Sequence, residues 1–157
     1  VKHTTNNAVV SGQTEVGGFI GYMQDLKQPT DISFEDCVNN VNINGTSLYA
    51  GGFVGYISSN TNIVVVFSNS TNDAIITQSH NYVGGFIGRL SNCNNVMVTI
   101  SDSTNNGNVT GSGGWVGGFA GTILNNTNMS TTVSQFTNNG NVNVLVDLLG
   151  IFPPART

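Results

Sequence analysis

Residues that could do acid–base chemistry are few in this sequence, and they do not gather in one segment. The acidic residues number eight: Glu15, Asp25, Asp31, Glu35, Asp36, Asp73, Asp102 and Asp147. Asp36 and Asp102 lie 66 residues apart, which is twice the 33-residue spacing of a sequence repeat in this chain. If successive repeats stack as neighbouring strands, two repeats place these carboxylates about 10 Å apart. That separation would suit an inverting glycosidase. Carboxylates at turns more often accept backbone hydrogen bonds, so we predict no catalytic residue and a non-enzymatic protein.

Histidine and cysteine do not complete a site either. His3 lies near the start of the sequence and His80 in a predicted loop, with no serine or cysteine nucleophile implied beside it. Cys37 and Cys93 fall at different positions of the repeat, whereas a disulfide needs Cα atoms within about 7 Å. Their spacing matches no zinc motif. We predict two buried free thiols, with an inter-subunit disulfide as the alternative, and we expect no metal and no cofactor.

Four near-copies of one hexapeptide set the organisation of the chain. They begin at Val16, Ala50, Val83 and Val116 and read VGGFIG, AGGFVG, VGGFIG and VGGFAG. Their starts are 34, 33 and 33 residues apart, and a fixed period in this range is typical of a repeat architecture. Residues 149–152 read as a fifth, degraded copy. We predict units at about 1–21, 22–55, 56–88, 89–121 and 122–152, with a tail at 153–157.

The remainder of each unit is typical of strands and turns. A β-rich run such as Ile63 to Phe67 leads to an Asn-rich turn, and a further strand leads to the hexapeptide. No segment has the 3.6-residue periodicity of a helix, and the abundant Gly, Asn, Thr and Val are weak helix formers. Strand-only units of this length bury their apolar faces by coiling and stacking. The sequence therefore predicts an all-β fold, a single β-solenoid (parallel β-helix) domain over 1–157 with about four to five coils.

Alternation of side chains along a strand predicts the core. If the hexapeptide and its flanks form one strand, Tyr49 and Ile57 share a face with Phe53, and the opposite face carries Val83 and Ile87. That second face is also apolar, which indicates burial on both sides or a contact surface. Stacking then predicts a core column of Phe19, Phe53, Phe86 and Phe119.

Two further columns follow from the same register. An internal ladder of hydrogen-bonded amides is predicted at Asn39, Asn72, Asn105 and Asn138, although Asn also suits these turns simply because it tolerates left-handed geometry. An aromatic ladder is predicted at Tyr49, Tyr82 and Trp115. Such a strip could bind sugar rings or a protein partner, or it could merely cover glycines in the neighbouring strand. Arg89 is expected to be a solvated strand residue.

The stretch from Asn105 to Gly121, NNGNVTGSGGWVGGFAG, resembles the GLUG repeat. That repeat combines an Asn/Gly turn, a G-N-V strand and V-G-G-L-V-G, and it occurs in large secreted and cell-surface proteins, including adhesin-like proteins and surface proteases. This chain has Phe where the usual repeat has Leu, and its unit is somewhat longer. The resemblance covers nearly the whole chain in four copies and implies a surface location. It implies no catalytic residues, because GLUG repeats have no agreed ones.

Composition favours an extracellular or cell-surface protein. Only 8% of the residues are charged, against about 25% in ordinary domains. The net charge of −4 and the absence of a basic run argue against nucleic-acid binding. No apolar stretch approaches the ~20 residues of a membrane helix, and the lack of an initial Met fits a mature product or an excised segment. Candidate N-glycosylation sites, which also arise by chance in so Asn-rich a chain, are Asn44, Asn69, Asn108, Asn125 and Asn128.

Two classes of function remain. The favoured one is an extracellular structural protein whose solenoid self-associates, for example end to end, into a filament or surface layer. Solenoid ends expose unpaired strand edges, and low charge removes the repulsion that keeps such edges apart. Pro153 and Pro154 could stop this pairing. The alternative is a cell-surface adhesin or carbohydrate-binding module. The expected partners are therefore copies of the same chain or surface glycans, not nucleic acid.

Overall fold

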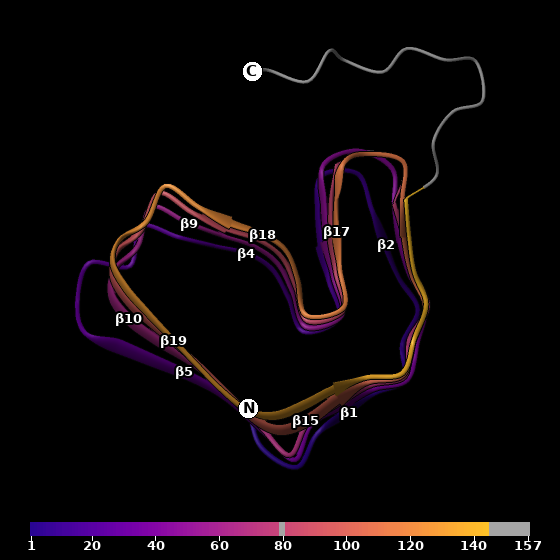
Figure 1. Cartoon of the computed structure of the whole chain (residues 1–157), viewed down its shortest axis with the longest axis horizontal. Coiled ribbons are helices and arrows are strands. Elements are labelled where there is room, and N and C mark those ends of the chain that lie inside the picture. Colours follow the sequence, from indigo (N-terminus) through magenta and orange to yellow (C-terminus); the bar gives the residue numbers. More distant parts are fainter. Residues whose placement is uncertain (79–80, 145–157) are drawn as a thin grey trace.

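A computed structural model describes residues 1–78 and 81–144 of the 157-residue chain, and it confirms the predicted fold class (Figure 1). These residues form strands and turns without a helix. The paired strands are all parallel, and each residue pairs with the one a single coil away: Phe67 pairs with both Phe34 and Ile100. The result is a β-solenoid of about four turns, whose coils largely superimpose in Figure 1, although the loop that leads into β5 extends outside the others.

Four parallel sheets run along the solenoid, and each coil that is described in full contributes a segment to every sheet. Sheet A contains β1 (Thr5–Asn6), β5 (Thr30–Glu35), β6 (Val38–Asn39), β10 (Thr61–Ser68), β11 (Thr71–Asn72), β15 (Asn94–Asn105) and β19 (Thr127–Asn138). Sheet B contains β2 (Val10–Gly12), β7 (Ile43–Gly45), β12 (Ile76–Gln78), β16 (Val109–Gly111) and β20 (Val142–Val144). Sheet C contains β3 (Glu15–Gly17), β8 (Tyr49–Gly51), β13 (Tyr82–Gly84) and β17 (Trp115–Gly117). Sheet D contains β4 (Ile20–Gln24), β9 (Val54–Ser58), β14 (Ile87–Ser91) and β18 (Ala120–Leu124).

Several corners and bulges of the coil are built from residues in the left-handed backbone conformation. Among the described non-glycine residues, those with positive φ form columns at equivalent positions of successive coils: His3, Asp36, Asn69, Asp102 and Gln135; Asp25, Ser59, Asn92 and Asn125; and Asn62, Asn95 and Asn128. Most are Asn or Asp, whose short polar side chains tolerate this conformation. The asparagines in these columns therefore have a direct geometric role.

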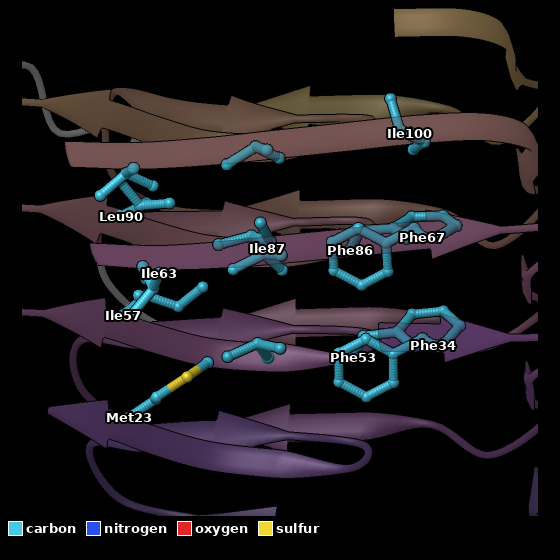
Figure 2. Close-up of a cluster of buried hydrophobic side chains, with 14 of the residues drawn as sticks. Met23, Phe34, Phe53, Ile57, Ile63, Phe67, Phe86, Ile87, Leu90 and Ile100 are labelled. Atoms are coloured by element: carbon cyan, nitrogen blue, oxygen red, sulfur yellow. The ribbon is translucent and has the colours of Figure 1, made fainter. Parts of the chain in front are cut away.

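The interior is divided into two apolar compartments. The larger one lies between sheets A and D, and the smaller one lies between sheets B and C. Figure 2 shows the larger compartment, in which Phe53 and Phe86 form one column and Phe34 and Phe67 another. Ring centroids within a column are 4.6 Å apart for Phe53–Phe86 and 5.1 Å for Phe34–Phe67, whereas Phe53 meets Phe67 edge to face at 5.5 Å. Both geometries are favourable for aromatic pairs.

The hexapeptide and its flanks are not a single strand, which corrects the predicted faces. The chain makes a sharp turn at the second glycine and the Phe of each hexapeptide, so that sheets C and D diverge (Figure 1). Phe53 and Ile57 lie in the larger compartment, whereas Tyr49 lies in neither compartment. Val83 and Ile87, predicted to share a face, lie in different compartments. Period-two alternation does not carry across the turn, because the chain changes direction there.

Candidate functional site

The predicted Asn positions form a continuous ladder of side-chain hydrogen bonds inside the solenoid. The Asn39 Nδ2 atom donates to Asn72 Oδ1 at 3.0 Å, Asn72 donates to Asn105 at 2.7 Å, and Asn105 donates to Asn138 at 2.7 Å. Asn6, which the ladder prediction omitted, adds a first rung by donating to Asn39 at 3.0 Å. Asn39, Asn72 and Asn105 are fully buried, so these bonds satisfy groups that water cannot reach.

The ladder packs directly against the Gly-Gly turns, which explains the second glycine of the hexapeptide. A Cβ atom on Gly85 would lie 2.0 Å from the carbonyl oxygen of Gly118 and 2.7 Å from the Asn105 amide. The same contacts recur in each coil, for example between Gly52 and Asn72. The glycine is needed for space, because side chain and backbone of neighbouring coils occupy the position where a Cβ would lie. The Asn ladder and the Gly-Gly turns are thus one structural unit.

A second asparagine ladder lies on the surface one residue later and runs in the opposite direction. The Asn139 Nδ2 atom donates to Asn106 Oδ1 at 2.8 Å, and Asn106 donates to Asp73 at 2.8 Å. Asn40 likewise donates to Asn7 at 3.1 Å. Asp73 interrupts this outer ladder because a carboxylate can accept a hydrogen bond but cannot donate one to Asn40.

Both cysteines are buried and free, and each one occupies a position that other coils fill with a hydrogen-bonding residue. Cys37 stands where Ser70 and Ser103 stand, and its thiol donates to the Glu35 carbonyl oxygen at 3.3 Å. Cys93 donates to the Ser91 carbonyl oxygen at 3.3 Å. Burial raises the pKa of the Cys93 thiol above its ordinary value. Both thiols therefore lie in the packed interior, next to the apolar side chains of the larger compartment.

The aromatic ladder lies outside both compartments, in the angle between sheets C and D. Tyr49 stacks on Tyr82 at 5.3 Å, and Tyr82 stacks on Trp115 at 4.9 Å. A second column from sheet D faces it, and the two meet where Tyr49 stacks on Tyr56 at 4.2 Å. A Cβ on Gly51, Gly84 or Gly117 would meet backbone atoms first, so these glycines are needed for the close approach of the main chain. We call Tyr22, Tyr49, Tyr56, Tyr82, Trp115 and Arg89 the aromatic cluster.

Arg89 lies within this cluster and is not the solvated residue that we expected. Its guanidinium carbon is 4.6 Å from the centroid of Tyr82 and 5.6 Å from those of Tyr49 and Tyr56. Its Nη1 atom donates to the Tyr49 hydroxyl at 3.2 Å, and its buried Nε has no hydrogen-bond partner. Burial raises the pKa of Tyr49, and the neighbouring cation offsets part of that effect. The cluster holds the cation through the faces of its rings.

Exposure differs along the aromatic cluster. Tyr49 and Tyr56 are buried in its middle, whereas Trp115 is 47% exposed at one end and Tyr22 is 42% exposed at the other. The inner rings therefore have a packing role. The terminal rings are held rigidly by their stacked neighbours and present apolar surface to solvent, which is a suitable arrangement for binding a flat apolar face.

Two of the acidic residues, Asp36 and Asp102, occupy corners of the coil. Asp36 and Asp102 occupy the same corner column with Asn69 between them, and Asn69 Nδ2 donates to Asp36 Oδ1 at 2.5 Å. His3 Nδ1 lies 3.0 Å from the other oxygen of Asp36. Within residues 1–78 and 81–144, no three His, Cys, Asp or Glu side chains are grouped so that they could hold a metal ion. His80, Asp147, the degraded hexapeptide at 149–152 and the prolines at 153–154 lie outside the described residues.

All five candidate glycosylation residues have exposed positions: Asn44, Asn69, Asn108, Asn125 and Asn128. Asn125 and Asn128 lie at corners with φ of 54° and 51°. Asn69 already uses its amide in the bond to Asp36, and Asn108 accepts a bond from the Asn141 backbone nitrogen at 2.9 Å. Glycosylation at these residues stays a prediction.

Comparisons with protein-family models, with curated proteins and with solved structures give no match to this chain. Membership of the GLUG family therefore stays a prediction. Over the described residues, the structure contains no helix of the length and apolar character that a membrane crossing requires.

Proposed function

We propose that this protein is a non-enzymatic structural protein of the cell surface or extracellular space, and that its solenoids associate end to end into a filament or surface layer. The observation that supports this most is the uncharged edge formed by β19 and β20. Residues 103–144 contain no charged side chain. Solenoids and sheets usually guard such an edge with charges, prolines or a cap, because open strand edges pair with other strands.

The side chains on this edge match what a further coil would bury. Among the described strands, β19 pairs with β15 alone. Val133 on β19 is 58% exposed, whereas Ile100 and Phe67 at the equivalent position of lower coils are fully buried. A coil placed on this edge would bury Val133 in the same way, and full burial of such a side chain is worth about 1.5–3 kcal/mol.

The inner Asn ladder gives the association a direction. Each amide nitrogen donates toward the β19 edge, so that edge presents the Asn138 nitrogen, and the opposite edge presents the Asn6 oxygen. Head-to-tail stacking continues both the ladder and the parallel pairing. Head-to-head contact would instead place like groups opposite each other. We therefore expect polar filaments rather than symmetric dimers.

The test is a charge placed on the edge. Val133→Lys should keep the solenoid folded by circular dichroism but abolish higher assemblies in light scattering and negative-stain electron microscopy. Ser134→Lys is the matched control, because its position on the same strand is equivalent to the partly exposed Ser101 on the outer surface and it should still assemble. Wild-type protein that stays a monodisperse monomer at high concentration would overturn the proposal.

A surface adhesin or carbohydrate-binding module is the second candidate, and the 47% exposure of Trp115 at the end of a stacked column favours it. Rigid exposed rings suit the apolar face of a sugar. A glycan array should then give binding that Trp115→Ala removes and Trp115→Phe largely retains. Binding that is unchanged in Trp115→Ala, or an array without any signal, would dismiss this candidate.

A further inference from the structure

A groove crosses the outer face of sheet A, away from both core compartments and from the aromatic cluster. Its volume is about 500 Å³, within the range of small-ligand sites. The groove spans four successive coils next to the corner that precedes β5, β10, β15 and β19, at the lower left of Figure 1. Its lining includes Asp31, Asn62, Val64, Asn95, Met97 and Ser130.

One wall of the groove is a column of asparagines in the left-handed conformation. Asn62, Asn95 and Asn128 have φ values of 58°, 55° and 51°. The Asn95 Nδ2 atom donates to Asn62 Oδ1 at 2.6 Å. Because each amide has two donor hydrogens and two acceptor lone pairs, this bond leaves donors and acceptors along the wall for a ligand. These amides recur in three of the four coils, with Pro29 at the equivalent position of the first, so the wall suits an extended ligand.

The floor of the groove is aliphatic in the middle and polar at its ends. Val64 and Met97 pair across β10 and β15, and Met97 is 47% exposed although its neighbours Val96 and Val98 are buried. Asp31 lies in the first of the four coils and Ser130 in the last. Among the described residues that line the groove, Asp31 carries the single charge.

We propose that this groove binds an extended, uncharged oligosaccharide. Hydroxyl groups of a sugar both donate and accept hydrogen bonds, which matches the Asn amides, the Asp31 carboxylate and the Ser130 hydroxyl. The C–H face of a sugar ring is apolar and matches Val64 and Met97. Ligand sites combine an apolar lining with a few placed polar groups in this way.

Charge and backbone geometry argue against other ligands. The described lining contains no Lys or Arg to receive a phosphate or a carboxylate, and Asp31 would repel such an anion. An added peptide strand needs an open sheet edge, whereas β10 and β15, which form the floor, are paired on both sides. The groove is on the outer face of sheet A and not on the edge proposed for end-to-end association, so the two proposals can fail separately.

The test uses the whole chain in affinity electrophoresis, with gels that contain a neutral β-glucan, a neutral mannan or the polyanion polygalacturonate. Asn95→Gly removes one amide from the wall but permits the positive φ, and Met97→Glu places a charge on the floor. The matched controls are Asn92→Gly, which has a φ of 56° in another corner column, and Thr99→Glu, which is two residues further along the same strand. A neutral polymer should retard the wild type and both controls, with retardation at least fivefold weaker in Asn95→Gly and absent in Met97→Glu.

Three outcomes would overturn the proposal. The first is a lack of retardation by either neutral polymer. The second is retardation by polygalacturonate alone, which would indicate an anion site elsewhere. The third is retardation that the groove variants do not weaken. A change in oligomeric state with Met97→Glu, measured by sedimentation without any polymer, would instead identify this face as a contact between copies of the chain.

Discussion

The first coil and the last described coil follow the same backbone path over their strands but differ in charge. Seven of the charged side chains lie within residues 1–36: Lys2, Glu15, Asp25, Lys27, Asp31, Glu35 and Asp36. Lys2 contacts Glu35 at 2.5 Å. Residues 103–144 have no charged side chain, although both regions contribute to the Phe column and to the inner Asn ladder. The contacts that build a coil are therefore separate from the charged side chains, which gather in the first coil.

A single added methyl group should disrupt the backbone path that the two coils share. Gly85→Ala places a Cβ 2.0 Å from the Gly118 carbonyl oxygen, where neighbouring coils leave no room. We expect a loss of about 3 kcal/mol or more in the free energy of unfolding, measured by urea denaturation. Gly114→Ala is the control, because no atom lies within 4 Å of its Cβ position, and its stability should match the wild type. Equal stability of the two variants would contradict the close packing of the turns.

The inner and outer Asn ladders should differ in the same experiment. Asn72→Ala leaves the buried amides of Asn39 and Asn105 without their partner, and unsatisfied buried groups cost about 1–3 kcal/mol each. Asn106→Ala removes an exposed amide from the outer ladder and should stay within about 0.5 kcal/mol of the wild type. Equal effects of the two substitutions would show that the inner ladder contributes no more than a surface contact.

Substitution of Arg89 should change the stability by a smaller amount. Arg89→Met keeps much of the apolar side chain but removes the cation from the three tyrosine rings, at an expected cost of about 1–2 kcal/mol in thermal unfolding. Arg89→Lys should recover part of this loss, because an ammonium also interacts with a ring face. A Met variant that is more stable than the wild type would mean that burying the unpaired Nε destabilises the fold by more than the ring contacts stabilise it.

Removal of charge from the first coil should have the smallest effect on stability. It tests whether the charges on this edge slow association. The double variant Glu35→Gln, Asp36→Asn disrupts the pairs with Lys2 and His3, which are exposed and contribute little to folding. Fewer charges at this edge should accelerate association by a factor of a few in light scattering at low salt. High salt should reduce the difference from the wild type, since salt screens exposed charges. Slower association would contradict a protective role for these residues.

The sequence predicts the stacking well, because like residues at a 33-residue spacing must meet in a parallel solenoid. The register of the Asn ladder follows from that spacing alone. The turn inside the hexapeptide could not be predicted, since Tyr82, Phe86 and Leu90 keep an even spacing across it. The position of Arg89 could not be predicted either, because its partner Tyr49 is 40 residues away and belongs to another sheet. The groove was missed because Asn62 and Asn95 read only as turn residues.

The most direct test of stacked coils is a series of distances between spin labels on the outer face of sheet B. Asn44 pairs with Thr77, Thr77 with Thr110, and Thr110 with Asn143, one on each successive coil. Paired labels at 44 and 77, 44 and 110, and 44 and 143 should show backbone separations that grow by about 4.8 Å per coil. Labels at 44 and 143 that lie as close together as those at 44 and 77, or separations that do not increase in this order, would contradict the solenoid.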